Sequence, residues 1–249
     1  MTYNPSSYWE KRLSRKFALS GVGNISFSER YNRWGYKAKA RKLEDVLSYN
    51  CIEVKGKSVC DIGCGTGFYT DFYLRRGAED IVGIDITSVS VENLKKKYPN
   101  CSFVQDSIAS SGILNKINRK FDIVNIFDVL YHITDDAAFK QALSNICDLA
   151  KQNGFIVFTD TWTGDRHFSE HVKKRDREGY EAAFRDGGVE ILGVYPLFRL
   201  LNWPIFPRLP HFNYIIDNTL APLYYYLDMT SLPLRKSNLD LIIARKSDT

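Results

Sequence analysis

The sequence contains no long apolar run and no low-complexity block. No part of its 249 residues forms an unbroken apolar stretch long enough to cross a bilayer, and residues 1–16 lack the apolar centre of a signal peptide. Its composition, 44% hydrophobic and 25% charged, is close to that of soluble globular proteins. We therefore expect a cytoplasmic protein with a single domain over residues 1–249, because this length fits two full domains poorly.

Cysteine pairs and metal-ligand spacings are also missing. The five cysteines form no C-x-x-C pair, and their odd number does not suit a disulfide framework. His167 and His171 are four residues apart, but the segment lacks the H-E-x-x-H order and no third ligand is evident. We expect reduced, mostly buried thiols and no metal.

A strong excess of charge of one sign is absent as well. The formal net charge is +5, and the basic residues are scattered apart from short clusters at residues 95–97 and 173–177. This balance permits nucleic-acid binding but does not require it.

The centre of the chain alternates short apolar runs with segments of helical period. This pattern is typical of repeated βα units that feed a parallel sheet. The sequence therefore predicts an α/β core over residues 51–196. The expected strands are residues 58–62, 81–86, 101–105, 121–127, 155–159, 190–195 and 239–244.

Two segments fall outside the alternation. Residues 1–50 contain a basic amphipathic stretch, and we expect them to form a helical N-terminal cap. Residues 197–238 are rich in proline and aromatic side chains, and we expect them to form an inserted lid before the last strand, residues 239–245. Residues 224–227 of this insertion could also contact a membrane surface or a second copy of the chain.

The strongest local pattern is D-x-G-x-G-x-G at the end of the first expected strand, formed by Asp61, Gly63, Gly65 and Gly67. Glycines between a strand and a helix let the backbone approach a ligand closely. The dinucleotide fingerprint is G-x-G-x-x-G instead, and an aspartate before the glycines would repel a diphosphate. The same aspartate can accept hydrogen bonds from a ligand's ammonium group.

This pattern resembles the first motif of class I S-adenosylmethionine-dependent methyltransferases, and the resemblance extends over about residues 57–160. It implies a Rossmann-like three-layer α/β/α sandwich with a seven-stranded, mostly parallel sheet whose last strand is antiparallel. S-adenosylmethionine would be the cofactor and S-adenosylhomocysteine the product. The residues that the resemblance assigns to the cofactor are Asp61, Gly63, Cys64, Gly65, Gly67, Asp85, Ile86, Asp106, Ser107 and Phe127.

The assigned roles follow the order of the strands. Asp85 closes the second strand about twenty residues after the glycines, where the family's acidic residue accepts the ribose hydroxyls. Asp106 and Ser107 match the position that reads the adenine edge, and Phe127 should lie near the sulfonium. Each aspartate alone could instead be a helix cap, but their joint order and spacing favour the cofactor.

A general base is needed only if the acceptor is a poor nucleophile such as a hydroxyl, and histidine has a suitable pKa. His132 follows the fourth strand, whereas His167 and His171 would share one helical face after the fifth. These three histidines are candidates for catalysis. The alternatives are that His132 caps or packs against the following helix and that His167 and His171 form a solvated face.

The chain also lacks sequence motifs of known acceptor classes, and this limits the classes of acceptor to be expected. The fourth strand lacks the [DN]-P-P-[YF] sequence of the amino-nucleobase enzymes, and no Pro-Cys nucleophile of the cytosine type is present. We therefore expect a small-molecule, lipid-like or glycan acceptor and O-methylation. An RNA-modifying enzyme and a non-catalytic cofactor-binding module are the alternatives. Candidates for acceptor or lid contacts are Tyr31, Arg33, Trp34, Tyr131 and Trp203, although core packing is an equal alternative for Trp34.

Overall fold

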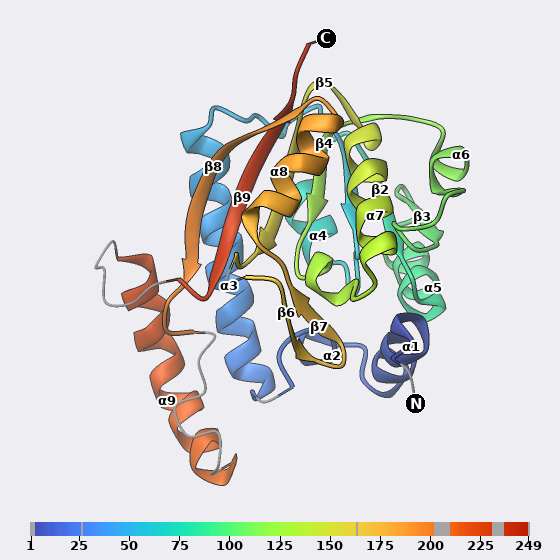
Figure 1. Ribbon diagram of the computed structural model, residues 1–249. Helices are drawn as coiled ribbons and strands as arrows, with labels where there is room; N and C mark the ends of the chain where they lie inside the picture. Colours follow the sequence, from blue (N-terminus) through green and yellow to red (C-terminus); the bar gives the residue numbers. More distant parts are fainter. Residues whose placement is uncertain (1–2, 26, 163, 202–209, 231–236, 249) are drawn as a thin grey trace.

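The structure is a computed structural model of the chain. It describes residues 3–25, 27–162, 164–201, 210–230 and 237–248, with the backbone alone for 210–218. These residues form a seven-stranded sheet with helices on both sides (Figure 1). The predicted three-layer α/β/α architecture is confirmed.

The strands of the sheet run in the order β3-β2-β1-β4-β5-β9-β8. The first five pair in parallel, whereas β9 is antiparallel to both of its neighbours, as predicted for the last strand. A separate hairpin of β6 and β7 follows β5. The strands are β1 (Ser58–Ile62), β2 (Asp80–Asp85), β3 (Ser102–Gln105), β4 (Phe121–Ile126), β5 (Ala150–Asp160), β6 (Arg166–Ser169), β7 (Val172–Lys174), β8 (Val189–Phe198) and β9 (Leu239–Lys246).

Helices connect these strands and also precede the first of them. Several helices begin at a side chain that accepts a backbone N–H, such as Asp135, which bonds the Ala138 amide at 2.8 Å. The helices are α1 (Pro5–Arg15), α2 (Leu19–Val22), α3 (Glu29–Tyr49), α4 (Phe68–Leu74), α5 (Ser88–Lys97), α6 (Ile113–Ile117), the 3-10 helix η1 (Leu130–His132), α7 (Asp136–Leu149), α8 (Arg177–Asp186) and α9 (Pro210–Met229).

Both faces of the sheet are buried. Neighbouring residues alternate between two apolar clusters, as Val59 and Cys60 do on β1. This alternation is typical of parallel strands covered by helices on each side. One cluster includes residues of α3, α4 and α9, and the other includes residues of α6, α7 and α8.

The strand order reverses at β1. β1 pairs with β2 on one side and with β4 on the other, so that Ile62 lies beside both Ile84 and Ile126. The loops that follow these strands must therefore diverge, and they leave a crevice at the carboxyl ends. Ligands of open α/β sheets bind at such a reversal point.

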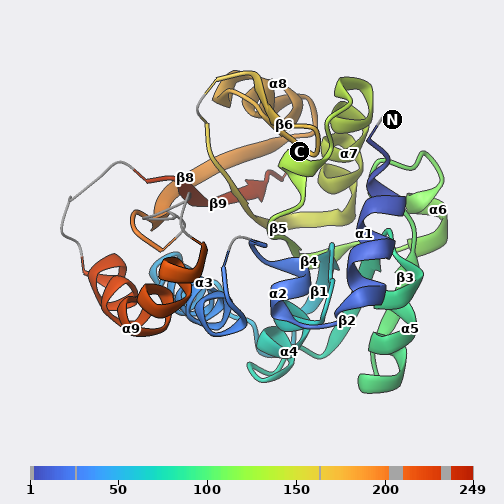
Figure 2. The same ribbon diagram turned by 90° about the horizontal axis from the view of Figure 1, so that it is seen from below.

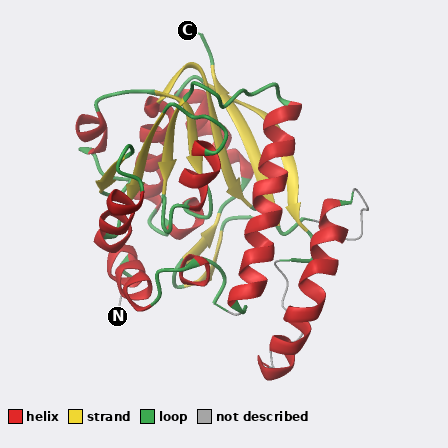
Figure 3. Cartoon of the chain, turned by 180° about the vertical axis from the view of Figure 1, so that it is seen from behind, coloured by secondary structure: helices red, strands yellow, loops and turns green. Residues whose placement is uncertain are grey.

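The described part of the first fifty residues contains three helices, α1, α2 and α3, in agreement with the predicted helical character of this segment. Figure 2 shows α1 and α2 at the edge of the sheet where β1, β2 and β4 end. The long helix α3 covers one face of the sheet, and α9 lies beside it (Figure 3). None of the helices formed by the described residues combines the length and the apolar character that crossing a membrane requires.

Two details of the predicted elements are wrong. His167 and His171 do not share a helical face, because residues 166–174 form the β6-β7 hairpin, with His167 on β6 and His171 in the turn. The Asn153-Gly154 pair of the sequence predicts the end of the helix before β5, but this helix already ends at Leu149, because Ala150 pairs with Phe121 of β4. Sequence spacing alone could not show either pairing.

Candidate functional site

A cavity of about 340 Å³ lies at the carboxyl ends of β1, β2, β3 and β4, within the size range of small-ligand sites. Ile62 of β1 and Ile84 and Asp85 of β2 line it, together with residues that directly follow β3 and β4. The predicted cofactor residues that line it are Gly63, Cys64, Gly65, Asp85, Ile86, Asp106, Ser107 and Phe127. The sequence motifs are therefore brought together at one site.

The loop after β1 takes a conformation that favours glycine. The φ angles of Gly63, Gly65 and Gly67 are 70°, 49° and 79°, in the left-handed region. A Cβ atom on Gly63 would lie 2.2 Å from Cγ2 of Val129, so the loop after β4 packs directly on this glycine. Gly67 does not line the cavity and instead caps the N-terminus of α4.

Asp85 joins the ends of two strands. One carboxylate oxygen accepts the Gly65 amide at 2.8 Å, and the other accepts the amide and hydroxyl of Thr87 at 2.9 and 2.7 Å. The residue is buried, and burial raises the pKa of its carboxyl group. Asp85 therefore fixes the glycine loop while it lines the cavity.

Asp61 does not line the cavity. Its carboxylate is buried and accepts hydrogen bonds from Thr70 Oγ1 at 2.7 Å and from Asn125 Nδ2 at 2.9 Å. Burial raises the pKa of Asp61 to about 6, in spite of these two donors. In the structure this carboxylate connects β1, α4 and β4 below the glycine loop.

The end of β3 contributes two polar residues. Asp106 accepts the Ser107 amide at 2.8 Å and forms an ion pair with Lys116 at 2.6 Å.

Cys64, on the glycine loop, lies in the same cavity, and burial raises the pKa of its thiol well above the usual value. The thiol is therefore protonated at neutral pH.

Aromatic side chains line the end of the cavity beyond β4. Tyr36, Phe68, Tyr69 and Phe127 all line it, and the Tyr69 and Phe127 ring centroids are 4.2 Å apart. The hydroxyl of Tyr69 is buried and has no hydrogen-bond partner within the described part of the chain. A buried polar group without a partner points to a ligand that completes it.

His132 lies at the same end, in van der Waals range of an aromatic residue of α1. Its Nδ1 is 2.7 Å from the carbonyl oxygen of His171, and its ring centroid is 5.0 Å from that of Trp9. Because a carbonyl only accepts, Nδ1 carries the proton and Nε2 has a free lone pair. Burial lowers the pKa of His132 to about 4, so the ring is neutral.

The other two histidines lie outside the cavity lining. His171 positions His132 through its backbone, and its own ring stacks on Tyr8 with 5.1 Å between centroids. His167 is exposed on β6. Of the three predicted histidines, only His132 therefore contacts the cavity.

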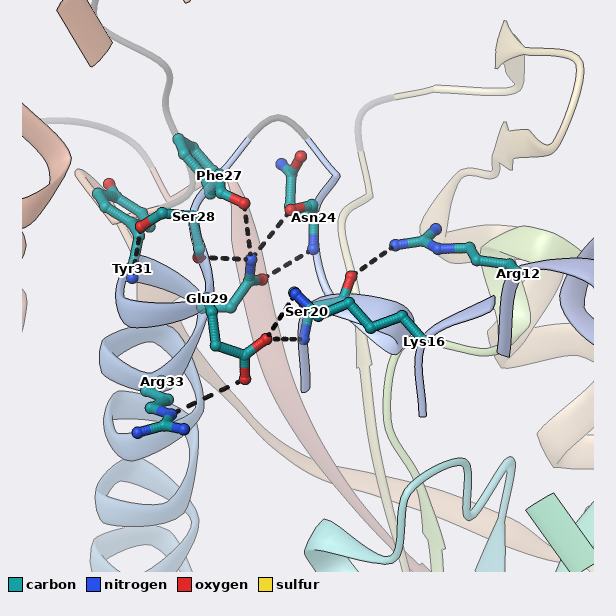
Figure 4. Close-up of polar contacts among 10 residues, drawn as sticks. Arg12, Lys16, Ser20, Asn24, Phe27, Ser28, Glu29, Tyr31 and Arg33 are labelled. Carbon is teal, nitrogen blue, oxygen red and sulfur yellow. Dashed lines mark hydrogen bonds and ion pairs between the residues drawn. The ribbon is translucent and has the colours of Figure 1, made fainter. Parts of the chain in front are cut away.

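The predicted contacts from α3 also lie elsewhere. Figure 4 shows Arg33 pointing to Glu29, with 3.8 Å between Nε and Oε1. Tyr31 is buried in the core, and Trp34 packs on Tyr225 of α9 at 5.2 Å between centroids. None of Tyr31, Arg33 and Trp34 lines the cavity.

The two remaining residues that were predicted to contact the acceptor are Tyr131 and Trp203. Tyr131 is partly buried behind the lining, and its hydroxyl donates to Asp128 at 2.9 Å. Trp203 lies outside the described residues. No described residue of the 197–238 insertion lines the cavity, and several of them pack on the α3 side of the sheet instead.

Sequence reasoning missed the contribution of the first helix. Tyr3, Pro5, Trp9 and Leu13 line the cavity from α1 and the residue pair before it. The aromatic residues of this segment were a signal, but they have no strand or motif context. Their position depends on tertiary packing, because α1 lies at the carboxyl ends of the strands (Figure 2).

The sequence is similar to known methyltransferases. The family described as Methyltransferase domain matches residues 53–192, more than half of the chain. A ubiquinone biosynthesis O-methyltransferase of Neisseria meningitidis serogroup C (strain 053442) is 30% identical over 155 residues, which cover 58% of this chain and 64% of that protein. The chain thus spans less than two thirds of the length of this relative.

Two solved structures have a similar fold. The magnesium protoporphyrin IX methyltransferase of Synechocystis PCC 6803 with bound SAM has a TM-score of 0.63 at 17% identity, covering 99% of both chains. The N-methyltransferase NodS of Bradyrhizobium japonicum WM9, in complex with S-adenosyl-l-homocysteine, has a TM-score of 0.59 at 14% identity, covering 99% of this chain and 100% of that one. At these identities the likeness shows the fold alone.

Proposed function

We propose that this chain, which belongs to the methyltransferase domain family, transfers a methyl group from S-adenosylmethionine to a hydroxyl oxygen of a small molecule. The observation that carries the proposal is the cavity that the glycine loop, Asp85, Asp106 and His132 line together. The relative named as a ubiquinone O-methyltransferase supports oxygen as the methylated atom.

The lining suits S-adenosylmethionine better than a nucleotide phosphate. Four aspartates and no lysine or arginine occur among the described residues of the lining, so a diphosphate would find no cationic side chain there to bind it. Asp85 would accept the ribose hydroxyls, and Asp106 with Ser107 would face the adenine. Thr66 Oγ1, which is buried without a partner in the described residues, would complete its hydrogen bonding on the ligand.

When bound, S-adenosylmethionine supplies a methyl group on a positively charged sulfur, which the acceptor oxygen displaces in line to leave S-adenosylhomocysteine. The protein's task is to align the acceptor and to receive its proton. Nε2 of His132 would accept the hydroxyl proton and release it to solvent. The hydrogen bond to the His171 carbonyl keeps the ring in the required tautomer.

Exclusion of water would be the role of α1. Trp9 and Leu13 of α1 line the cavity, and Figure 2 shows α1 at the edge of the sheet where β1, β2 and β4 end. Glu10 fastens the helix to the start of α5, because its carboxylate accepts the amide and hydroxyl of Ser88, each at 2.8 Å. A covered site favours displacement by the acceptor over hydrolysis.

The RNA-modifying alternative is weakened by one of the two basic clusters. Lys173 and Arg175 are nearly buried and pair with Asp136 at 2.7 and 2.9 Å, so these charges are used within the protein. RNA binding that weakens about tenfold or more on a severalfold rise in salt would restore the alternative. Binding that is absent or insensitive to salt would remove it.

The test of the proposed function is formation of S-adenosylhomocysteine from S-adenosylmethionine in the presence of small phenols and alcohols. Replacement of the proposed base, His132→Gln, should lower turnover by about a hundredfold. His167→Gln is the matched control, because His167 is exposed and outside the cavity, and it should leave turnover unchanged. Binding of S-adenosylmethionine without turnover on any acceptor would favour the non-catalytic alternative.

A further inference from the structure

A buried ion pair lies at the aromatic end of the cavity. Lys39, on α3, pairs with Asp128, which follows β4 and lines the cavity. The side chains are only 11% and 17% exposed. An ion pair this deep costs desolvation of both groups and is a weak source of stability, so its presence suggests another role.

Asp128 is held from three directions. Besides Lys39, its carboxylate accepts the Tyr131 hydroxyl at 2.9 Å, and its amide donates to Thr159 Oγ1 at 2.9 Å. Its φ angle is 59°, and it is the one non-glycine residue with positive φ among the described residues that line the cavity. Such backbone strain is concentrated at binding sites, where the surroundings enforce it.

The charges around this end cancel. Lys39 neutralises Asp128. His132 is neutral because burial lowers its pKa to about 4. An ammonium on the acceptor would gain little from Asp128 while Lys39 neutralises it, and the described residues of the lining include no lysine or arginine for a carboxylate.

Tyr69 supplies a hydrogen bond beside this neutral site. The residue is 7% exposed, its ring packs on Phe127, and its hydroxyl has no partner in the described residues. Burial raises the pKa of Tyr69 well above the usual value, with Asp128 as the next cause, so the hydroxyl remains a donor.

We infer that Lys39 and Asp128 select an uncharged acceptor that carries a second hydroxyl beside the reacting one, and that this second hydroxyl donates to Asp128 and accepts from Tyr69. Lys39 is thus a specificity-determining residue that acts through Asp128 and does not itself line the cavity. The inference rests on the proposed function, because it assigns the acceptor end of the same cavity. Without Lys39 the unpaired Asp128 would attract a cation instead.

Three catechols of different charge test the inference: protocatechuate is an anion, methylcatechol is neutral and dopamine is a cation. Each is titrated into protein saturated with S-adenosylhomocysteine. The native protein should bind methylcatechol at least about tenfold more tightly than the other two. Tyr69→Phe should weaken methylcatechol about fivefold, the value of one hydrogen bond.

Lys39→Met is the decisive variant. It should shift the ratio of dopamine to methylcatechol affinity about tenfold or more toward dopamine, since it leaves Asp128 without its cation. Lys39→Met with Asp128→Asn removes both charges and should abolish this shift, and its melting temperature reports folding. Lys37→Met, on the exposed side of the same helix, is the matched control and should not change the ratio.

Two results would overturn the inference. One is equal affinity of the native protein for the three catechols, or binding of none of them. The other is an unchanged affinity ratio in folded Lys39→Met. In either case, retained binding of S-adenosylhomocysteine leaves the proposed function standing, whereas loss of that binding in the native protein contradicts the proposed function itself.

Discussion

The carboxylate of Asp85, at the end of β2, accepts the amide of Gly65 at 2.8 Å and so holds the glycine loop that follows β1. The two strongest motifs of the sequence are therefore one physical unit. Asp85 can present a carboxylate to a ligand only while Gly65 and Thr87 keep it in place. Damage to the loop should impair ligand binding even where the substituted residue does not touch the ligand.

Substitution of Gly63 by alanine tests whether the loop geometry matters, and the same substitution at Gly56 is the matched control. Gly63→Ala places a methyl group 2.2 Å from Val129 Cγ2, in addition to the strain of φ 70°. Gly56→Ala has a similar φ of 72° but meets nothing within 4 Å. Both variants should lose about 1 kcal/mol of stability from backbone strain, and Gly63→Ala about 2 kcal/mol more from the clash.

The measurements for this pair are thermal unfolding and affinity for S-adenosylhomocysteine. Only Gly63→Ala should lose affinity, because Gly56 lies before β1 and away from the cavity. Equal affinity loss in both variants would show that general destabilisation, and not the loop geometry, determines binding.

Glu10 should control how long a ligand stays in the cavity. Its carboxylate accepts the Ser88 amide and hydroxyl and, at 3.2 Å, the Val89 amide at the N-terminus of α5. Glu10→Ala removes these charge-assisted bonds and should speed dissociation of S-adenosylhomocysteine about tenfold in stopped-flow fluorescence. Lys11→Ala, an exposed neighbour on α1, should leave the rate unchanged; equal rates in both variants would contradict the role of Glu10.

The neutral state of His132 predicts a pH dependence of stability. Burial lowers its pKa to about 4 from an unfolded value of about 6.5, so the unfolded chain binds the extra proton between these pH values. The contribution is therefore lost as pH falls below about 6.5, with a slope of at most about 1.4 kcal/mol per pH unit. Asp61 and Asp160, whose pKa values burial raises to about 6, act in the opposite direction.

The difference in stability between the native protein and His132→Gln, followed over pH, gives the contribution of His132 alone, because both proteins keep the two aspartates. Denaturant unfolding at several pH values should show a steeper acid loss in the native protein. Imidazole nitrogen NMR should show the Nδ1–H tautomer down to about pH 5. Titration of His132 near pH 6.5 would contradict its buried, neutral state.

Much of the fold could be predicted from local patterns. The apolar runs at 58–62 and 121–127 coincide with strands because both faces are buried, and the D-x-G-x-G-x-G pattern marks the turn at β1. The antiparallel β9 followed from the family resemblance and is confirmed. The function of residues 197–238 as a lid stays a prediction.

The acceptor end of the site was harder to predict because distant segments build it. Lys39 and Asp128 are 89 residues apart and belong to no shared motif. Trp9 belongs to a short helix whose packing on the strand ends has no periodic signal. Sequence spacing could predict site residues that belong to the same βα unit. Contacts between the N-terminal helices and the core could be identified only from the tertiary structure.

The central claim is that the cavity binds S-adenosylmethionine through Asp85, and calorimetric titration tests it most directly. The native protein should bind S-adenosylmethionine and S-adenosylhomocysteine and should not bind NAD. Asp85→Ala should weaken both sulfur ligands about a hundredfold, since it removes charge-assisted hydrogen bonds and releases Gly65. Unchanged affinity in folded Asp85→Ala, or no binding by the native protein, would contradict the account.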